Sequence, residues 1–146
     1  RRERVRETIL AVKQLWTEDE AEFHGEFIDF DPSWAWPKPV KEKGPRIMLG
    51  GASGPTTFQH VAEFGNGWMP IGGSGIKASL SDLQKVCESN ERDFSEISIV
   101  PFGTVPDQGK LDYFEELGVD EVILRVPAGP RDLVLETLDS YVSFLK

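Results

Sequence analysis

The sequence has a single cysteine, Cys87, and only two histidines, His24 and His60. One cysteine excludes an intrachain disulfide, which fits a reducing cytoplasm. The histidines and the cysteine lack the spacing of a zinc site, so no metal is expected. Cys87 lies in the polar stretch DLQKVCESN, where a structural role is far commoner than a nucleophilic one.

The chain also lacks an excess of basic residues and any long apolar run. It has 16 Lys and Arg against 25 Asp and Glu, a net charge of −9, which argues against nucleic-acid binding. No run approaches the roughly 20 apolar residues that a membrane helix needs. The start, RRERVRETI, has neither the apolar core of a secretory signal nor an initiator Met. We therefore expect a cytoplasmic protein without membrane or nucleic-acid partners, and a chain cut from a longer one.

The 146 residues suffice for one domain with a real core, here a single partial domain over residues 1–146. Its first part, 1–17, is predicted to be a helix from apolar residues at helical spacing. These are Val5, Ile9, Val12 and Trp16. Residues 18–45 are predicted to be an insertion, with a hairpin excursion around Gly25 and an ordered surface loop in SWAWPKPVKEKGP.

From residue 46 to residue 146 a strand and a helix alternate four times. Strands are expected at 46–51, 66–71, 97–103 and 119–126. Helices are expected at 55–64, 77–92, 108–117 and 130–145, the last burying Leu133, Leu138, Tyr141 and Leu145. This alternation predicts an α/β fold with parallel strands, in an open doubly wound sheet or in half of a closed barrel. Periodicity alone does not choose between them.

In both arrangements ligands bind beyond the C-terminal ends of the strands. The first candidate is the turn Gly50-Gly51-Ala52-Ser53, which precedes a helix and has the glycines that let a backbone approach a phosphate. The alternative is a plain turn that Ser53 or Gly54 caps.

Further candidates follow the later strands. Trp68, Pro70 and Ile71 either wall a ring-shaped ligand or pack in the core, and the glycine run 72–75 is either a lid or slack. Arg125 either faces an anionic substrate or cofactor tail, or pairs with a carboxylate such as Glu121 or Asp120. The acidic residues at 18–22 have no fixed ligand spacing, and no catalytic triad or carboxylate pair is found.

Four motifs, in this order, resemble those of bacterial luciferase-like monooxygenases. The first is Arg4-x-x-Glu7 with Leu15-Trp16, and the second is Phe23-x-Gly25-x-Phe27 with Pro37-Lys38-Pro39. The third is the strand from Pro45 to Gly51, and the fourth is Gly67-Trp68-Met69-Pro70. The resemblance covers residues 1–71 by motif and the remainder only by its strand–helix pattern. Asn66 replaces the family's usual Asp before Gly-Trp, so no carboxylate role is assumed there.

The resemblance implies a (β/α)8 TIM barrel, of which this chain is the C-terminal half. It implies a fourth helix, then β/α units five to eight, with a missing N-terminal half as the partner that supplies the catalytic residues. The stretch WTEDEAEFHGEFIDFDPSWAWPKPV most resembles the branch of F420-dependent oxidoreductases. Coenzyme F420 is therefore the expected cofactor, and FMN is the alternative.

In that branch the turn at Gly50, Gly51, Ala52 and Ser53 lies beside the cofactor's phosphate-bearing tail. Trp68, Pro70 and Ile71 would wall the pocket of a small organic substrate, and a homodimer is a further partner to test. Two other functions stay open. One is an FMN-dependent monooxygenase of the same family, and the other is a non-catalytic flavin-binding or structural half barrel.

Overall fold

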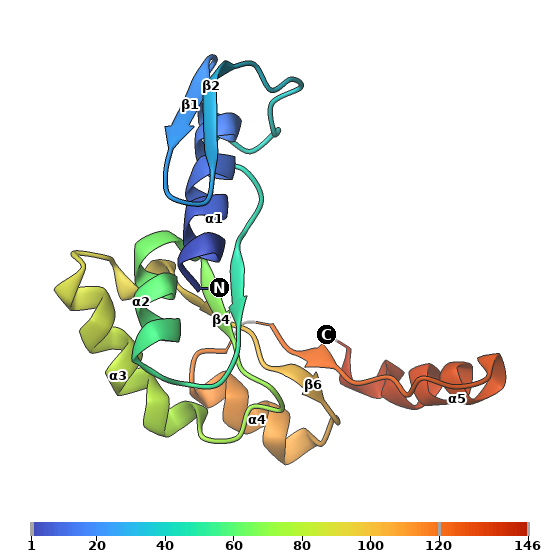
Figure 1. The fold of residues 1–146 in the computed structure, drawn as a ribbon. Helices are drawn as coiled ribbons and strands as arrows, with labels where there is room; N and C mark the ends of the chain where they lie inside the picture. Colours follow the sequence, from blue (N-terminus) through green and yellow to red (C-terminus); the bar gives the residue numbers. More distant parts are fainter. Residues whose placement is uncertain (1, 120, 146) are drawn as a thin grey trace. The chain divides into compact units, whose positions relative to one another are not determined.

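The computed structural model describes residues 2–119 and 121–145 (Figure 1). The chain forms two compact units, Arg1–Ile47 and Met48–Lys146. Their boundary falls close to residue 46, where the predicted insertion gives way to the predicted β/α units. Each unit is described by itself below, and the single partial domain stays a prediction.

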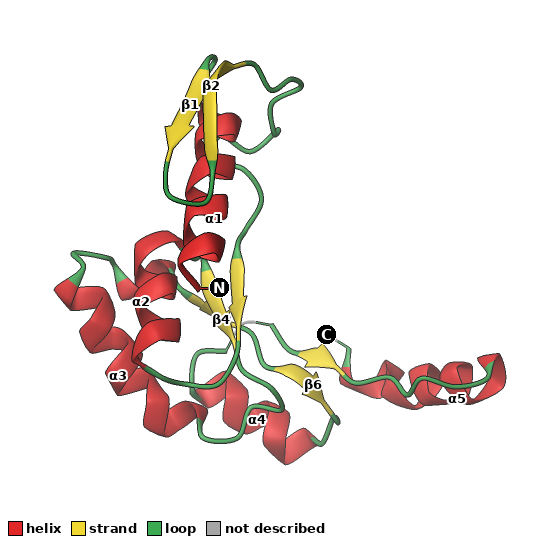
Figure 2. Ribbon diagram, viewed as in Figure 1, coloured by secondary structure: helices red, strands yellow, loops and turns green. Residues whose placement is uncertain are grey.

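The first unit is a helix followed by an antiparallel hairpin (Figure 2). Helix α1 spans Arg2–Thr17, strand β1 spans Ala21–His24 and strand β2 spans Asp29–Ser33. Phe23 pairs with Phe30 across the hairpin, and His24 pairs with Asp29. The predicted helix and the predicted hairpin excursion are both confirmed.

One carboxylate ties the hairpin turn to α1. Glu7 accepts hydrogen bonds from the amides of Glu26 at 3.1 Å, Phe27 at 2.7 Å and Ile28 at 3.1 Å. A Cβ on Gly25 would overlap this carboxylate, so the turn needs glycine there. The motifs around Glu7 and Gly25 therefore act together: the Glu7 carboxylate binds the hairpin turn, and Gly25 leaves room for it.

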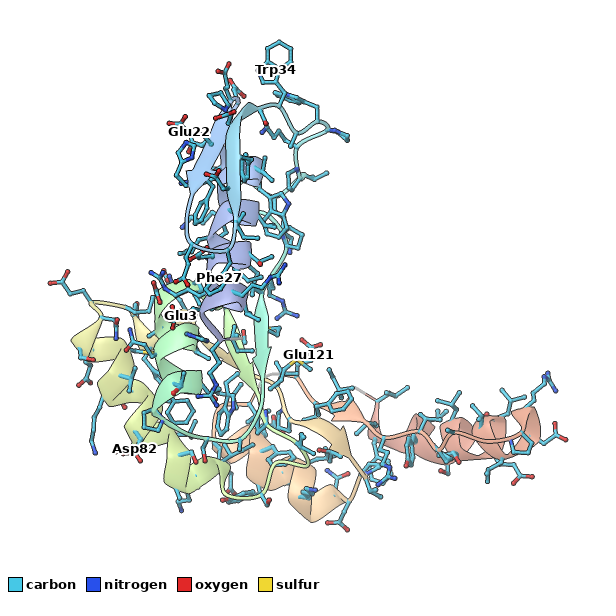
Figure 3. All side chains as sticks on the ribbon, viewed as in Figure 1. Glu3, Glu22, Phe27, Trp34, Asp82 and Glu121 are labelled. Carbon is cyan, nitrogen blue, oxygen red and sulfur yellow. The ribbon has the colours of Figure 1, made fainter. Side chains whose placement is uncertain are left out.

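The loop after β2 is anchored by a cation at the end of α1. The Lys38 ammonium donates to the Leu15 carbonyl at 2.9 Å and to the Glu18 carbonyl, which meets the free carbonyls and the negative dipole of the helix end. Farther along, a Cβ on Gly44 would overlap the Trp16 ring. Trp34 projects from this loop and is 79% exposed (Figure 3).

The second unit alternates strands and helices. Its strands are β3 (Met48–Gly50), β4 (Gly67–Met69), β5 (Ser98–Ile99), β6 (Phe102–Thr104) and β7 (Ile123–Leu124). Its helices are α2 (Pro55–Phe64), α3 (Ile76–Ser89), α4 (Gln108–Glu116) and α5 (Arg131–Tyr141), with 3-10 turns η1 (Phe94–Glu96) and η2 (Val142–Phe144). Every predicted strand and helix is present, and most of the strands are shorter than predicted.

All these strands run parallel, in the order of the chain. β3 pairs with β4, β4 with β5, and β6 with β7. β5 and β6 are one extended segment that is interrupted at Pro101, which has no amide to donate. Across the interruption, the Val100 amide donates to the Trp68 carbonyl and the Phe102 amide donates to the Pro70 carbonyl. The third predicted strand is therefore real but broken by its proline.

The core fills one face of this sheet. Leu49, Trp68 and Ile99 occupy one row of the register, and all three lie in or against the main apolar cluster. Helices α2, α3 and α4 cover this face, and each contributes to the cluster. Their contributions include Phe58, Leu83 and Phe114. None of the described helices is long and apolar enough to cross a membrane.

The last helix differs from its prediction. Leu133, Leu138 and Leu145 are 46%, 44% and 70% exposed, and none of the described residues of α5 is buried. The predicted buried face is therefore wrong for this structure. The apolar spacing is present, but among the described residues no strand pairs beyond β7 for the helix to cover.

Candidate functional site

The loops that leave β3, β4, β6 and β7 emerge at one edge of the sheet, because the strands are parallel. We call this the C-terminal edge, and it is where α/β folds bind ligands. The predicted site residues after β3 and β4, as well as Arg125 after β7, all belong to it.

The turn after β3 is open on the side where a ligand would approach. A Cβ added to Gly50 or to Gly54 would meet nothing within 4 Å. Gly51 has a φ of 146°, which L side chains rarely adopt. Its carbonyl accepts a hydrogen bond from the Trp68 indole at 3.0 Å. The Trp68 indole therefore fixes the Gly51 carbonyl, while the positions that side chains at Gly50 and Gly54 would occupy are open.

Helix α2 begins without a side-chain cap. Its N-cap is Gly54 and its first residue is Pro55, whereas the Asp107 carboxylate caps α4 by accepting from the Lys110 amide at 3.1 Å. Pro55 has no amide, so the first-turn amides of α2 are those of Thr56 and Thr57, and in the part of the chain that the structure describes no side chain at the N-cap accepts from them. Amides of this kind bind anions. The sequence left Ser53 or Gly54 open as the cap, and the structure assigns Gly54.

One residue near this turn was not selected from the sequence. A Cβ on Gly51 would lie 3.8 Å from the Thr57 hydroxyl, so Thr57 faces the turn from the first turn of α2. Its position two residues after a proline gave no signal for this. A hydroxyl so placed is a second donor beside the uncapped amides.

The three predicted pocket residues differ in environment. Trp68 is 2% exposed and packs edge-on against Phe58, with ring centroids 5.2 Å apart. Pro70 is buried, and Ile71 is 75% exposed. The Trp68 ring thus belongs to the core and to the support of the Gly51 turn, while Ile71 faces solvent. The pocket itself stays a prediction.

The glycine run after β4 is an ordered turn. The Gly72 amide donates to the Phe102 carbonyl at 2.7 Å, and a Cβ on Gly73 would overlap the Phe114 ring. Both glycines have positive φ, 67° and 78°. The sequence left a lid and slack open here, and the close contact with α4 favours a fixed connection.

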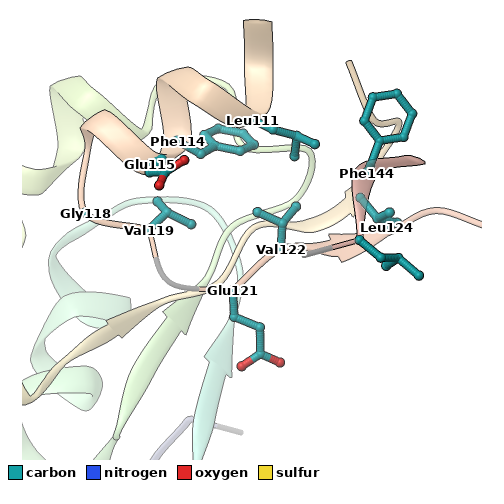
Figure 4. A pocket seen from close by; sticks show the side chains of 10 residues that line it. Leu111, Phe114, Glu115, Gly118, Val119, Glu121, Val122, Leu124 and Phe144 are labelled. Atoms are coloured by element: carbon teal, nitrogen blue, oxygen red, sulfur yellow. The ribbon is translucent and has the colours of Figure 1, made fainter. Parts of the chain in front are cut away.

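Two cavities lie beside the helices, and the smaller one reaches the C-terminal edge at Ser53 and Gly54. One of about 550 Å³ lies between α4 and β7, and its walls include Leu111, Phe114 and Leu124 (Figure 4). Another of about 280 Å³ lies between α2 and α3, where Ser53 and Phe58 face Asp82. The Asp82 carboxylate disfavours an anion there.

The remaining reactive groups have structural surroundings. Cys87 is fully buried, and burial raises the pKa of its thiol, so its predicted structural role is supported. The His60 ring lies 5.1 Å from that of Phe64. Within residues 2–119 and 121–145 no three His, Cys, Asp or Glu side chains could jointly hold a metal.

Known proteins match this chain in sequence. It is 37% identical over 129 residues to an uncharacterized protein of Mycobacterium tuberculosis, a match that covers 87% of this chain and 45% of that protein. It is 33% identical over 90 residues to an FMNH2-dependent dimethylsulfone monooxygenase of Pseudomonas putida, which covers 60% of this chain and 24% of that protein. The chain thus spans about half the length, 45%, of the mycobacterial relative.

Solved structures share the fold. A monooxygenase of Streptomyces bottropensis superposes with a TM-score of 0.72 at 17% identity, over 99% of this chain and 60% of that one. An F420-dependent tetrahydromethanopterin reductase of Methanopyrus kandleri gives 0.60 at 14% identity, over 80% and 40%. The fold is therefore a mixed α/β fold similar to that of luciferase-like barrel enzymes, and it covers part of their chains.

The family model for luciferase-like monooxygenases matches residues 1–106, which include all four motifs and the open turn. The chain belongs to the luciferase-like monooxygenase family, whose members are oxidoreductases.

Proposed function

We propose that the whole protein is an F420-dependent oxidoreductase that transfers a hydride between F420 and a small organic substrate. The observation that carries this proposal is the open, uncapped turn at Gly50, Gly51, Ala52 and Ser53. The Ala52 amide and the uncapped start of α2 offer hydrogen-bond donors to an anion such as a phosphate.

We further propose that this chain is the C-terminal half of a (β/α)8 barrel. Parallel strands in unbroken chain order support it, because an open doubly wound sheet reverses its strand order at a switch point. The face away from the helices carries Ile71, 75% exposed, and Phe102, 48% exposed. Strands from a missing N-terminal half would cover such a face.

Within this half, the chain's contribution is binding and orientation. The amides of Ala52, Thr56 and Thr57 would hold the phosphate, and Thr57 would add its hydroxyl. The Gly51 amide already donates to the Met69 carbonyl at 3.4 Å and would fix the turn. Trp68 would keep the Gly51 carbonyl turned away from the anion, while Pro70 and Ile71 would wall the substrate pocket. When bound, F420 supplies the hydride that is exchanged at its C5 atom. We assign the general acid or base to the missing N-terminal half of the barrel. We further propose that the whole enzyme is cytoplasmic.

The test is a variant at Gly50 in the full-length protein. A Cβ at this position would meet nothing within 4 Å, so we expect valine to fold with little change, yet its side chain would occupy the ligand's approach. We expect Gly50→Val to weaken F420 binding by roughly 1–3 kcal/mol, the value of a charge-assisted hydrogen bond. Gly51→Val is a poorer test, because its φ of 146° would add backbone strain.

The matched control is Ala52→Gly, which removes only an exposed methyl group and should change F420 affinity little. Affinity is measured from the change in F420 fluorescence, and folding is measured from the melting temperature. If a folded Gly50→Val protein binds F420 with unchanged affinity, the turn has a structural role only and the proposed phosphate site is wrong.

A second candidate is an FMN-dependent monooxygenase. The 33% identity over 90 residues to an FMNH2-dependent enzyme supports this candidate. The two candidates separate by titration of the same protein with F420 and with FMN. Tight FMN binding with oxygen consumption after reduction, and no response to F420, would decide for the monooxygenase.

A further inference from the structure

Three large apolar side chains project from the loop that follows β2. Trp34 is 79% exposed, Trp36 is 64% exposed and Val40 is fully exposed. Covering one tryptophan removes roughly 150–250 Å² of surface from water, so two exposed tryptophans on one short loop favour a partner that covers them. Tryptophan is also among the residues that contribute most of the binding free energy at protein interfaces. We call residues 34–43 the Trp loop.

Polar contacts hold the Trp loop in place. The Trp34 indole donates to the Glu20 carboxylate at 3.3 Å. The Lys38 ammonium lies 5.2 Å from the centroid of the Trp36 ring, and it also donates to two carbonyls at the end of α1. Because these contacts already fix the loop, little conformational entropy would be lost when a partner binds it.

The Trp loop is basic, whereas the hairpin beside it is acidic. The loop contains three lysines, Lys38, Lys41 and Lys43, and one carboxylate, Glu42. Residues 18–31 contain seven acidic side chains and no lysine or arginine. The seven are Glu18, Asp19, Glu20, Glu22, Glu26, Asp29 and Asp31, and all of them are exposed. We call residues 18–31 the acidic hairpin.

The two surfaces lie next to each other in the first unit. Trp34 directly follows β2 and Glu20 directly precedes β1, and the strand residues beside them, Ser33 and Ala21, are paired. Figure 3 shows Trp34 and Glu22 at the same end of this unit. A twofold rotation at this end can therefore place the basic surface of one copy against the acidic surface of another, as a symmetric dimer requires.

We propose that the Trp loop binds a second copy of this protein, with its tryptophans and lysines against the acidic hairpin of that copy. A second copy is favoured over another partner because the same unit carries both complementary surfaces. The four tryptophans of such a dimer and the surface that covers them would remove about 1,000 Å² from water, the size of a small specific interface. This dimer is independent of the cofactor and of the turn after β3.

The experiment measures the dissociation constant of the dimer for the full-length protein by analytical ultracentrifugation. One variant reverses the charge of the Trp loop, Lys41→Glu/Lys43→Glu, and another reverses the charge of the acidic hairpin, Glu22→Lys/Asp31→Lys. All four side chains are exposed, so each variant should fold, and its melting temperature verifies this. A third variant combines both reversals, and a fourth is Trp34→Ser.

We expect either reversal alone to weaken the dimer about tenfold or more, because like charges then face each other. The combined variant should recover most of the affinity, which a damaged fold would not do. Trp34→Ser should also weaken the dimer about tenfold or more. The matched control, Lys77→Glu/Lys85→Glu, makes the same charge change at exposed positions of α3 and should alter the constant less than about twofold.

Three results would overturn the proposal. The first is a dimer that tolerates both single reversals, since its interface must then lie elsewhere. The second is a monomeric wild-type protein in which Trp34 is shielded from acrylamide quenching, since the rest of the full-length chain must then cover the Trp loop. The third is a monomeric protein that binds vesicles of anionic phospholipid unless Trp34 is replaced by serine, since the loop then binds a membrane surface.

Discussion

The two units of this chain are held together by different interactions. In Arg1–Ile47 the buried hydrophobic side chains of the described residues are only Ala11 and Ala21, and the main ties are Glu7 on three amides and Lys38 on two carbonyls. In Met48–Lys146 a cluster of buried apolar side chains joins the sheet to α2, α3 and α4. A unit tied by charges should respond to pH, whereas one tied by apolar burial should respond to lost volume.

The largest effect is expected from a truncation in the apolar unit. Leu83 is fully buried in α3, so Leu83→Ala should lower the free energy of unfolding by about 2–5 kcal/mol. The matched control is Lys85→Ala in the same helix, where the side chain is 70% exposed and the cost should stay within about 0.5 kcal/mol. Denaturant unfolding of the full-length variants gives both values. Equal losses would contradict the difference in burial between the two positions.

A smaller and more local loss of stability is expected when the hydrogen bonds between Glu7 and the hairpin amides are weakened. Glu7→Gln removes the charge that three hairpin amides share, so these amides should exchange with solvent faster while the second unit stays protected. Glu3→Gln is the control, since Glu3 is exposed in the first turn of the same helix. Hydrogen exchange at residues 26–28 measures the difference. Unchanged exchange in Glu7→Gln would show that the hairpin is held by other contacts.

The stability of the first unit should fall at both low and high pH, because Glu7 and His24 lose their stabilising charges at opposite ends of the range. Hydrogen bonds from the Phe27 amide and its neighbours lower the pKa of Glu7 below 4.5, so its stabilisation is complete above 4.5 and is lost as pH falls through the lowered pKa. The hydrogen bond to Asp29, at 2.7 Å, raises the pKa of His24 above 6.5, so that contribution is complete below 6.5 and is lost as pH rises through the raised pKa. NMR titration of hairpin amides should detect both changes. A hairpin that responds at neither limit would contradict the comparison.

The comparison also explains what the sequence could predict. Helical spacing and strand–helix alternation identified the α-helices and located the parallel strands, because both patterns follow from the burial of side chains within one segment. The motifs at Glu7, Gly25 and Lys38 identified the family, yet the structure assigns all three to holding the first unit together. Motifs of this kind report a fold more directly than a reaction.

What the sequence could not predict depends on neighbours in space. The apolar spacing of α5 predicted burial, but burial needs a surface to cover, and beyond β7 the described chain offers none. Pro101 shortened the third strand by interrupting its ladder, a break that spacing alone did not indicate. Thr57 was missed because its approach to Gly51 depends on the direction in which α2 leaves the turn.

The smallest change in stability is expected from a variant at the start of α2, and it tests the proposed phosphate site directly. Gly54 has a φ of 165°, an extended backbone that any residue adopts, and a Cβ there would meet nothing within 4 Å. Gly54→Ser should therefore cap α2 and stabilise the protein by a few tenths of a kcal/mol, since serine caps helices slightly better than glycine. Because the new hydroxyl would occupy an amide that the proposed phosphate needs, F420 affinity should fall although stability rises. The reciprocal variant, Asp107→Gly, uncaps α4 and should lower stability by a similar amount with F420 affinity unchanged. Melting temperatures and F420 titrations of both variants provide the test. If Gly54→Ser is more stable but binds F420 with unchanged affinity, the amides of α2 have no role in binding.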